Sequence, residues 1–312
     1  MKWNRKDLLG LREVSAAEIR HILKTAKPMK EILFRSVKKL PTLRGKSVVT
    51  LFFENSTRTR VSFEIAGKVL GADTSSVAVA QSSVAKGESL LDTAKTIQAM
   101  QPDVVIMRHS SSGAAEYLAN LLKVSVINAG DGQQEHPTQA LLDIFTMQER
   151  LGDVAGRKVV IVGDILHSRV ARSNAYGLLK LGAEVTFVGP PTLLPPEMKA
   201  LGVRVTHDLE SALPGADAVM ALRLQLERQQ RGLLPTLREY SKLYGLNLKR
   251  LALTGKDTLV LHPGPMNRGV EIDSALADST YSVIEEQVTN GVAVRMALIY
   301  LLAGGGNTND VA

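Results

Sequence analysis

Short apolar runs alternate along the chain with longer segments in which apolar residues recur every three to four positions. The runs predict β-strands, and the longer segments predict α-helices. The expected strands are Ser47–Phe53, Ser75–Val79, Asp103–Arg108, Val124–Asn128, Lys158–Val162, Glu184–Val188, Val203–Thr206, Asp217–Leu222 and Thr258–Leu261. Alternation of this kind is typical of parallel sheets covered by helices, so we expect an α/β fold.

The expected helices divide the chain into two domains. Ser15 and Glu18 form a capping box before the first helix. Later helices are expected to begin near Thr57, Ser89, Gly113, Thr138, Ser168, Pro195, Asp208, Pro235, Asn247 and Ser282. No strand pattern follows the helix after Thr138 until Lys158, so we expect this helix to connect the two domains. We therefore expect two doubly wound parallel-sheet domains, residues 1–150 and 151–282, a last helix over about 283–303 and a tail at 304–312. No internal repeat is evident.

Composition narrows the class of protein. A length of 312 residues favours two domains, and an apolar content of 45% is ordinary for a globular chain. The apolar runs fall short of the ~20 residues that a membrane span needs, and the first residues lead into no signal-peptide core, so we expect a cytoplasmic protein. The chain has no cysteine. Disulfides, thiolate catalysis and cysteine-ligated zinc within the chain are therefore excluded.

The net charge of +7 suggests nucleic acid as one ligand, but basic residues are dispersed and aromatics make up only 4%. Small anionic substrates account for the charge equally well. There is no phosphate-binding Gly-x-x-x-x-Gly-Lys-Ser/Thr loop. The segment from Val160 to Asp164 begins like a dinucleotide fold but lacks the later glycines, which leaves Gly163 as a strand-to-helix turn.

A dense group of anion-binding side chains follows the first strand. Ser56, Thr57, Arg58, Thr59 and Arg60 lie where the next helix is expected to begin. Backbone N–H groups and the partial positive charge of a helix start favour an anion there, and three hydroxyls with two guanidiniums suit phosphate. The alternative is an ordinary N-cap, which needs one hydroxyl and gains nothing from two arginines. We therefore favour a phosphate site.

Further candidates come from strand ends and from the start of a helix. Arg108 ends a strand at the edge where open α/β sheets bind ligands, although a surface arginine is the alternative. Arg169 and Arg223 follow strands in the second half and would suit a dicarboxylate; for Arg169 the alternative is a charge on a helix face beside Arg172. His136 precedes Pro137 at an expected helix start. Of the other histidines, we interpret His21, His109, His207 and His262 as structural or solvated and leave His167 open.

Four segments resemble one family and occur in its order. They are Ser56-Thr57-Arg58-Thr59-Arg60, Met107-Arg108-His109, His136-Pro137-Thr138-Gln139 and Leu261-His262-Pro263-Gly264-Pro265, the last followed by Met266-Asn267-Arg268-Gly269. Together they resemble the aspartate and ornithine carbamoyltransferases. The chain lacks the cysteines and the Ser-Met-Gly loop typical of the ornithine branch, and Arg223 would repel a cationic ornithine tail. The resemblance therefore implies carbamoyl transfer from carbamoyl phosphate to L-aspartate, the committed step of pyrimidine (UMP) synthesis, without metal or organic cofactor.

The resemblance also implies residue roles. Catalytic roles fall to His136, Arg108, Thr59, Arg58 and Lys86. Carbamoyl phosphate would be bound by Ser56, Thr57, Arg58, Thr59, Arg108, His136, Gln139, Gly264, Pro265, Ser82 and Lys86. Aspartate would be bound by Lys86, Arg169, Arg223 and Gln225. Whether Ser82 or the adjacent Ser83 is the loop serine stays open, and a solvated lysine is the alternative for Lys86.

The resemblance extends to assembly. It implies a homotrimer in which Ser82 and Lys86 reach a neighbouring subunit's site, and a C-terminal helix that returns to the first domain. Separate regulatory or dihydroorotase chains are candidate partners, whereas nucleic acid and membranes are not expected. Two rival functions remain: a non-catalytic protein that binds phosphate-rich ligands or nucleic acid, and an enzyme that carbamoylates another amino acid.

Overall fold

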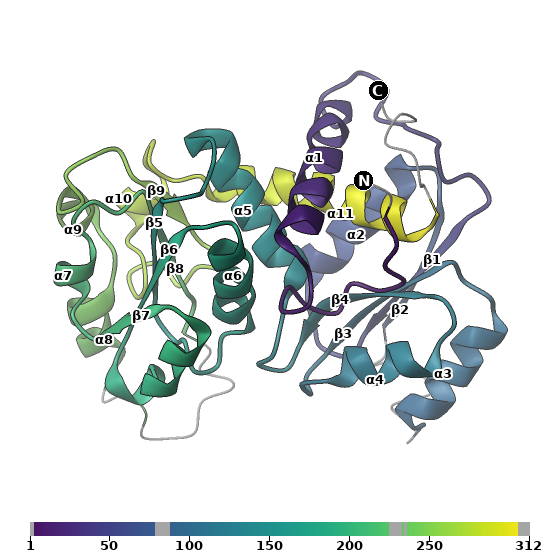
Figure 1. Cartoon of the computed structure of the whole chain (residues 1–312), viewed down its shortest axis with the longest axis horizontal. Helices are drawn as coiled ribbons and strands as arrows, with labels where there is room; N and C mark the ends of the chain where they lie inside the picture. Colours follow the sequence, from purple (N-terminus) through teal and green to yellow (C-terminus); the bar gives the residue numbers. More distant parts are fainter. Residues whose placement is uncertain (1–2, 79–87, 225–232, 234–235, 305–312) are drawn as a thin grey trace. The chain divides into compact units, whose positions relative to one another are not determined.

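A computed structural model describes residues 3–78, 88–224, 233 and 236–304 of the chain (Figure 1). The chain divides into two compact units. Unit 1 comprises Met1–Leu142 and Thr289–Ala312, and unit 2 comprises Asp143–Val288. The divisions fall inside two helices, α5 (Pro137–Leu151) and α11 (Ile284–Leu302). Most of the C-terminal helix therefore belongs with the first unit.

Unit 1 contains a parallel sheet in the order β2-β1-β3-β4. Its strands are β1 (Ser47–Phe52), β2 (Asp73–Ala78), β3 (Val104–His109) and β4 (Ser125–Asp131), and its helices include α1 (Ala16–Ile32), α2 (Thr57–Val69), α3 (Leu90–Ala99) and α4 (Ala114–Leu121). The chain runs from β1 outward to β2 and then returns to the other side of β1 for β3. Strand order therefore reverses between β1 and β3, the place where ligands of such sheets bind.

Unit 2 contains a second parallel sheet in the order β7-β6-β5-β8-β9, with its reversal between β5 and β8. Its strands are β5 (Lys158–Val162), β6 (Glu184–Val188), β7 (Arg204–Thr206), β8 (Ala218–Ala221) and β9 (Leu259–Leu261). Its helices include α6 (Arg169–Lys180), α7 (Leu209–Ala212), α8 (Leu237–Tyr244), α9 (Leu248–Ala252) and α10 (Ser274–Ala277). The predicted fold class, two parallel-sheet α/β domains, is confirmed.

Differences from the predicted elements are local. The helix expected near Pro195 is a 3₁₀ segment, Pro196–Leu201, followed by Gly202 at φ +90°. The sequence analysis missed α10, whose four residues are too few for a periodic pattern. The capping box at Ser15 and Glu18 is present, with both reciprocal hydrogen bonds.

Gly163 forms the predicted turn after β5. Its φ of +137° is unfavourable for other residues, and a Cβ there would lie 2.9 Å from the Leu222 carbonyl oxygen. The backbone of β5 thus passes close to the end of β8, which brings the two strand ends that flank the sheet reversal together.

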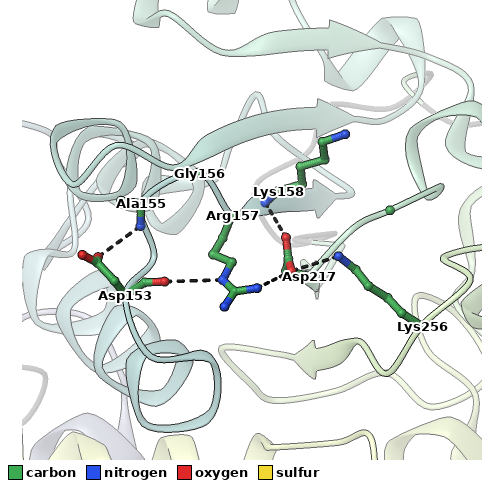
Figure 2. Close-up of a pocket in the computed structure, with 8 residues that line it drawn as sticks. Asp153, Ala155, Gly156, Arg157, Lys158, Asp217 and Lys256 are labelled. Carbon is green, nitrogen blue, oxygen red and sulfur yellow. Dashed lines mark hydrogen bonds and ion pairs between the residues drawn. The ribbon is translucent and has the colours of Figure 1, made fainter.

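The two units share one arrangement at the starts of their strands. In unit 1, Asp103 accepts hydrogen bonds from Ser47 N at 2.8 Å and from Lys46 Nζ at 2.8 Å. In unit 2, Asp217 accepts from Lys158 N at 2.8 Å and from Arg157 at 3.1 Å (Figure 2). Each aspartate precedes the strand that pairs with the first strand of its unit. The structure therefore reveals a repeated feature that the sequence analysis did not detect, because only a few residues carry it.

Asp217 lies in a pocket of about 640 Å³ at the amino-terminal edge of the unit 2 sheet (Figure 2). Lys256 Nζ also donates to Asp217, at 2.9 Å. The Asp217 side chain is 9% exposed, and these donors together lower the pKa of its carboxyl despite burial. Arg157 and Lys256 both bind the Asp217 carboxylate, and the pocket lies at the edge of the sheet opposite the ligand-binding edge. We therefore assign this pocket a structural role.

Candidate active site

Arg108 is the penultimate residue of β3, at the sheet reversal of unit 1. Its guanidinium donates to Glu54 Oε1 at 2.9 Å and to the Ala129 carbonyl oxygen at 3.2 Å, and its side chain is 11% exposed. Glu54 follows β1, and the Phe53 N–H donates to the Arg108 carbonyl at 2.9 Å. The alternative of a solvated surface arginine does not fit these contacts. Arg108 is held at the edge where an open α/β sheet binds its ligand.

The start of α2 differs from an ordinary capped helix. Ser56 is its N-cap residue, but the Ser56 side chain makes no capping hydrogen bond, and the first turn contains no acidic residue. In contrast, Ser15, Ser89 and Ser168 each accept a backbone N–H at the helices they cap. The Ser56 hydroxyl is thus not used for the one bond that the N-cap interpretation requires.

The other side chains of the motif divide between surface and interior. Thr57 and Arg58 are exposed, and Thr59 is buried. Arg60 lies 3.7 Å from Glu64 Oε1, one helical turn later. Of the two guanidiniums in the motif, Arg60 therefore takes part in an ion pair within α2, whereas Arg58 lies on the exposed first turn.

His136 and Gln139 lie at the start of α5. Both are buried, and the Gln139 N–H donates to the His136 carbonyl at 3.0 Å. Pro137 is the first residue of the helix, one residue before the predicted start at Thr138 and at a position that proline favours. One helical turn therefore carries both side chains.

A buried polar network holds the loop before His136. Glu135 accepts from the backbone N–H groups of Leu11 at 2.7 Å and Arg12 at 3.1 Å, and its own N–H donates to Asp131 at 3.2 Å. Asp131 also accepts from Asn128 at 2.8 Å. The sequence analysis missed these supporting residues. Their local signal was a set of polar positions in the second half of β4 and directly after it, next to His136.

Arg169 is the first residue of α6 in unit 2 and is only 4% exposed. Its neighbour Arg172 donates to the carbonyl oxygens of Leu166 at 2.9 Å and Ser168 at 3.2 Å. Burial lowers the pKa of the Arg172 guanidinium. Arg169 is therefore not an exposed charge on a helix face, and Arg172 has a structural role in the loop before α6.

Arg223 follows β8 and is partly buried. Asp164 follows β5, the other strand that flanks the sheet reversal. His167, which the sequence left open, bonds through Nδ1 to the buried Asp164 carboxylate at 2.8 Å. This pair closes the loop between β5 and α6. Arg169 and Arg223 thus both follow strands that flank the reversal in unit 2.

Gly264 and Pro265 follow β9 in unit 2. Gly264 has φ +65°, a conformation that other residues rarely adopt. Its N–H donates to His262 Nδ1 at 2.8 Å. Three predicted site residues, Ser82, Lys86 and Gln225, lie outside the described residues.

The remaining histidines make structural contacts. His21 stacks on Trp3 with ring centroids 6.3 Å apart, and burial lowers its pKa. His109 packs on Phe53 and accepts from the Ser111 N–H; burial is the largest influence on its pKa and lowers it. His207 bonds to the Gly189 carbonyl oxygen at 2.9 Å. None of these three was predicted as a site residue.

The described part of the chain contains no cluster of three or more His, Asp or Glu side chains arranged to hold a metal ion. None of its helices combines the length and the apolar character required to cross a membrane.

Comparison with known families covers both units. The model of the carbamoyl-phosphate-binding domain of aspartate/ornithine carbamoyltransferases matches residues 6–149, and the model of the Asp/Orn-binding domain matches residues 155–302. The chain belongs to the aspartate/ornithine carbamoyltransferase family. The family predicted from the four motifs is thus confirmed, and the chain is a carbamoyltransferase.

Relatives within the carbamoyltransferase family align along the whole chain. The aspartate carbamoyltransferase catalytic subunit of Desulfitobacterium hafniense (strain DSM 10664 / DCB-2) is 70% identical over 311 residues, which cover 100% of each chain. That of Moorella thermoacetica is 62% identical over 307 residues, which cover 98% of this chain and 100% of the relative.

Solved structures of both branches of the family resemble this chain. Aspartate transcarbamoylase from Trypanosoma cruzi, in complex with carbamoyl phosphate and aspartate, has a TM-score of 0.86 at 28% identity and covers 96% of this chain and 97% of its own. Ornithine carbamoyltransferase from Pyrococcus furiosus has a TM-score of 0.86 at 30% identity and covers 98% and 100%. The fold therefore does not separate the two branches, and the choice of acceptor depends on individual residues.

Proposed function

We propose that this chain transfers the carbamoyl group of carbamoyl phosphate to the α-amine of L-aspartate, which yields N-carbamoyl-L-aspartate and phosphate in pyrimidine (UMP) synthesis. The observation that carries the proposal is the placement of Arg108 at the sheet reversal of unit 1 and of Arg223 at that of unit 2. The identity of 70% with an aspartate carbamoyltransferase catalytic subunit supports aspartate as the acceptor.

Unit 1 would bind the phosphate. Ser56, Thr57, Arg58 and Thr59 begin α2, where free N–H groups and the helix dipole favour a dianion. The Ser56 hydroxyl makes no capping bond and would be available to the ligand. Arg108 would add a guanidinium that is already oriented by Glu54. In this proposal the carbamoyl-phosphate-binding domain comprises residues 1–150 and the helix over about 283–303. The aspartate-binding domain comprises residues 151–282.

The reaction develops negative charge on the carbamoyl oxygen as the neutral amine attacks the carbonyl carbon. We assign Thr59, Arg108 and His136 to stabilise that oxyanion, because preorganised donors lower the barrier to such a step. Gln139 and the backbone carbonyls around Gly264 and Pro265 would orient the carbamoyl amide. The leaving phosphate would accept the amine proton, so the proposal requires no strong protein base, metal or cofactor.

Unit 2 would bind aspartate. Arg169 and Arg223 offer two guanidinium forks for two carboxylates, with Gln225 as a further polar contact. Arg169 is the first residue of α6, after β5 at the sheet reversal of unit 2, and this edge of an open α/β sheet is where ligands bind. A cationic ornithine tail would be repelled by Arg223. Carboxylate pairing is therefore the basis for proposing aspartate.

Assembly extends the proposal beyond one chain. We infer that the enzyme is a cytoplasmic homotrimer in which Ser82 and Lys86 of one subunit complete the phosphate site of the next. Lys86 would also contact aspartate. A ring of three closes because each chain donates one loop and receives one. Separate regulatory or dihydroorotase chains are candidate further partners.

The decisive experiment is an assay of carbamoyl aspartate formation from carbamoyl phosphate with aspartate and, in parallel, ornithine. Aspartate-dependent product supports the proposal. Product with ornithine or another amino acid alone would instead favour the rival acceptor. If no acceptor yields product and phosphate still binds, the chain would be a binding protein for phosphate-rich ligands.

A further inference from the structure

A buried hydrogen-bond network surrounds the loop after β9 in unit 2. His262 and Glu271 are 2% and 1% exposed, and His262 Nε2 lies 3.1 Å from Glu271 Oε1. The same Glu271 oxygen accepts from the Asn267 N–H at 2.6 Å. His262 Nδ1 faces the Gly264 N–H at 2.8 Å. The imidazole therefore joins the first half of the loop to the second.

These contacts determine the tautomer of His262. The Gly264 N–H is a donor, so Nδ1 must accept with its lone pair, and the ring proton belongs on Nε2, where it donates to the Glu271 carboxylate. The bond from Gly264 N to a side chain two residues earlier has the pattern of an Asx-turn, with imidazole Nδ1 in place of the usual carboxyl or amide oxygen. One neutral imidazole thus fixes the backbone at Gly264.

A second chain of bonds holds the other side of His262. The His262 N–H donates to Gln287 Oε1 at 2.9 Å, and Gln287 Nε2 donates to Asp143 Oδ1 at 2.7 Å. Asp143 Oδ2 accepts from Asn174 Nδ2 at 2.8 Å. All of these groups are buried, so an unmade bond would cost more here than at the surface. The backbone before and after His262 is therefore fixed by separate partners.

We propose that His262 is a positioning residue of the carbamoyl site: its Nδ1 bond to Gly264 N, supported by Glu271 and Gln287, aims the carbonyl oxygens of the Gly264–Pro265 loop at the carbamoyl NH₂ group. The inference rests on the proposed function and adds a way for the site to select carbamoyl phosphate over acetyl phosphate. Carbamoyl phosphate carries N–H donors that carbonyls can accept, whereas acetyl phosphate has a methyl group in the same place. The loop thus distinguishes the NH₂ of a carbamoyl group from the isosteric methyl of an acetyl group.

Two substitutions separate the two ends of the imidazole. His262→Asn places an amide oxygen near the position of Nδ1 and keeps an acceptor for the Gly264 N–H. His262→Gln places an amide nitrogen near the position of Nε2 and keeps a donor for Glu271 but loses the Gly264 acceptor. Gln287→Met removes the bonds of Gln287 to the His262 N–H and to Asp143 without altering the imidazole. All three retain side chains of similar bulk, which limits cavity formation.

The test compares the affinities of the full-length protein for carbamoyl phosphate, acetyl phosphate and inorganic phosphate by equilibrium competition binding. We expect the unmodified protein to prefer carbamoyl phosphate over acetyl phosphate by roughly tenfold, the worth of one or two hydrogen bonds. His262→Asn should retain most of that preference. His262→Gln and Gln287→Met should abolish it while binding inorganic phosphate normally, because phosphate is held in unit 1.

Three outcomes would overturn the inference: full preference in His262→Gln, equal loss in His262→Asn and His262→Gln with phosphate binding intact, or no preference in the unmodified protein. If His262→Gln fails to fold, as judged by loss of phosphate binding, Gln287→Met decides. A protein that forms carbamoyl aspartate yet binds the two acyl phosphates equally would refute the positioning role and leave the proposed function standing. Absence of carbamoyl aspartate would refute the proposed function itself.

Discussion

Glu54 and Arg108 form an ion pair across the sheet reversal of unit 1, with Arg108 Nη2 2.9 Å from Glu54 Oε1. Their backbones lie on neighbouring strand ends, since Phe52 is paired in register with Arg108. The carboxylate orients the guanidinium before any substrate binds, and an incoming phosphate would then meet a donor whose direction is already set. Glu54 was not predicted as a site residue, so its effect on the reaction is a sharp test of this geometry.

We expect Glu54→Gln to lower kcat/KM for carbamoyl phosphate at least tenfold, because a neutral amide orients Arg108 less strongly than a carboxylate does. Glu64→Gln is the matched control, since Glu64 forms a longer ion pair with Arg60 within α2. Steady-state kinetics on both variants make the comparison. Equal effects of the two substitutions would mean that Glu54 has no special relation to the phosphate site.

His136→Ala should reduce turnover by about 2.7–4 kcal/mol in activation free energy, since His136 is assigned to charge that develops during the reaction. Affinity for inorganic phosphate should change little. His207→Ala is the control, because the His207 ring bonds to the Gly189 carbonyl oxygen and lies outside the predicted site. Normal turnover by His136→Ala would remove this residue from the mechanism.

Arg223→Ala should raise KM for aspartate at least tenfold and leave phosphate binding nearly intact, because the lost guanidinium serves a single substrate. Arg172→Ala is an informative comparison. It removes an arginine that binds backbone carbonyls before α6, so we expect it to lower thermal stability instead of selectively raising KM for aspartate. A parallel rise in both substrates' constants for Arg223→Ala would contradict the assignment.

Sequence pattern predicted the sheets well because strands buried on both faces are continuous apolar runs. Lys158–Val162 and Glu184–Val188 were predicted with the bounds that the structure has. Arg108 and His136 were proposed as site residues because their motifs adjoin a strand end and a helix start. Glu54 gave no signal because its partner lies 54 residues away, and the His262 network joins residues as distant as Asp143 and Gln287. Such pairings depend on topology, which spacing alone does not reveal.

The Arg5–Glu18 pair links stability to pH. Hydrogen bonding to Arg5 is the largest influence on the Glu18 pKa and lowers it from 4.5 to about 2. A lowered pKa in the folded state stabilises the protein above the unfolded value and loses that effect as pH falls toward the folded value. The difference in Tm between the unmodified protein and Glu18→Gln should therefore be constant from pH 7 to about 5 and shrink below pH 4.5. A difference that grew on acidification would have the wrong sign.

The last prediction is that active sites are shared between subunits. Lys86 is proposed to reach the neighbouring chain's phosphate, where its ammonium would pair with the anion held at Ser56–Thr59. Lys86→Ala chains and Arg58→Ala chains should each be nearly inactive. Mixed and reassembled together, they should regain activity, because some interfaces then combine an intact Lys86 with an intact Arg58.

The complementation experiment has an internal control. Lys95→Ala removes a lysine from the exposed part of α3, outside the proposed site, so chains carrying it should be active without a partner. Mass measurement of the mixed assemblies establishes that both chain types are present in one oligomer. If mixed trimers form and remain as inactive as the separate variants, Lys86 acts within its own chain, since a shared site would necessarily restore at least one complete set of residues per favourable interface.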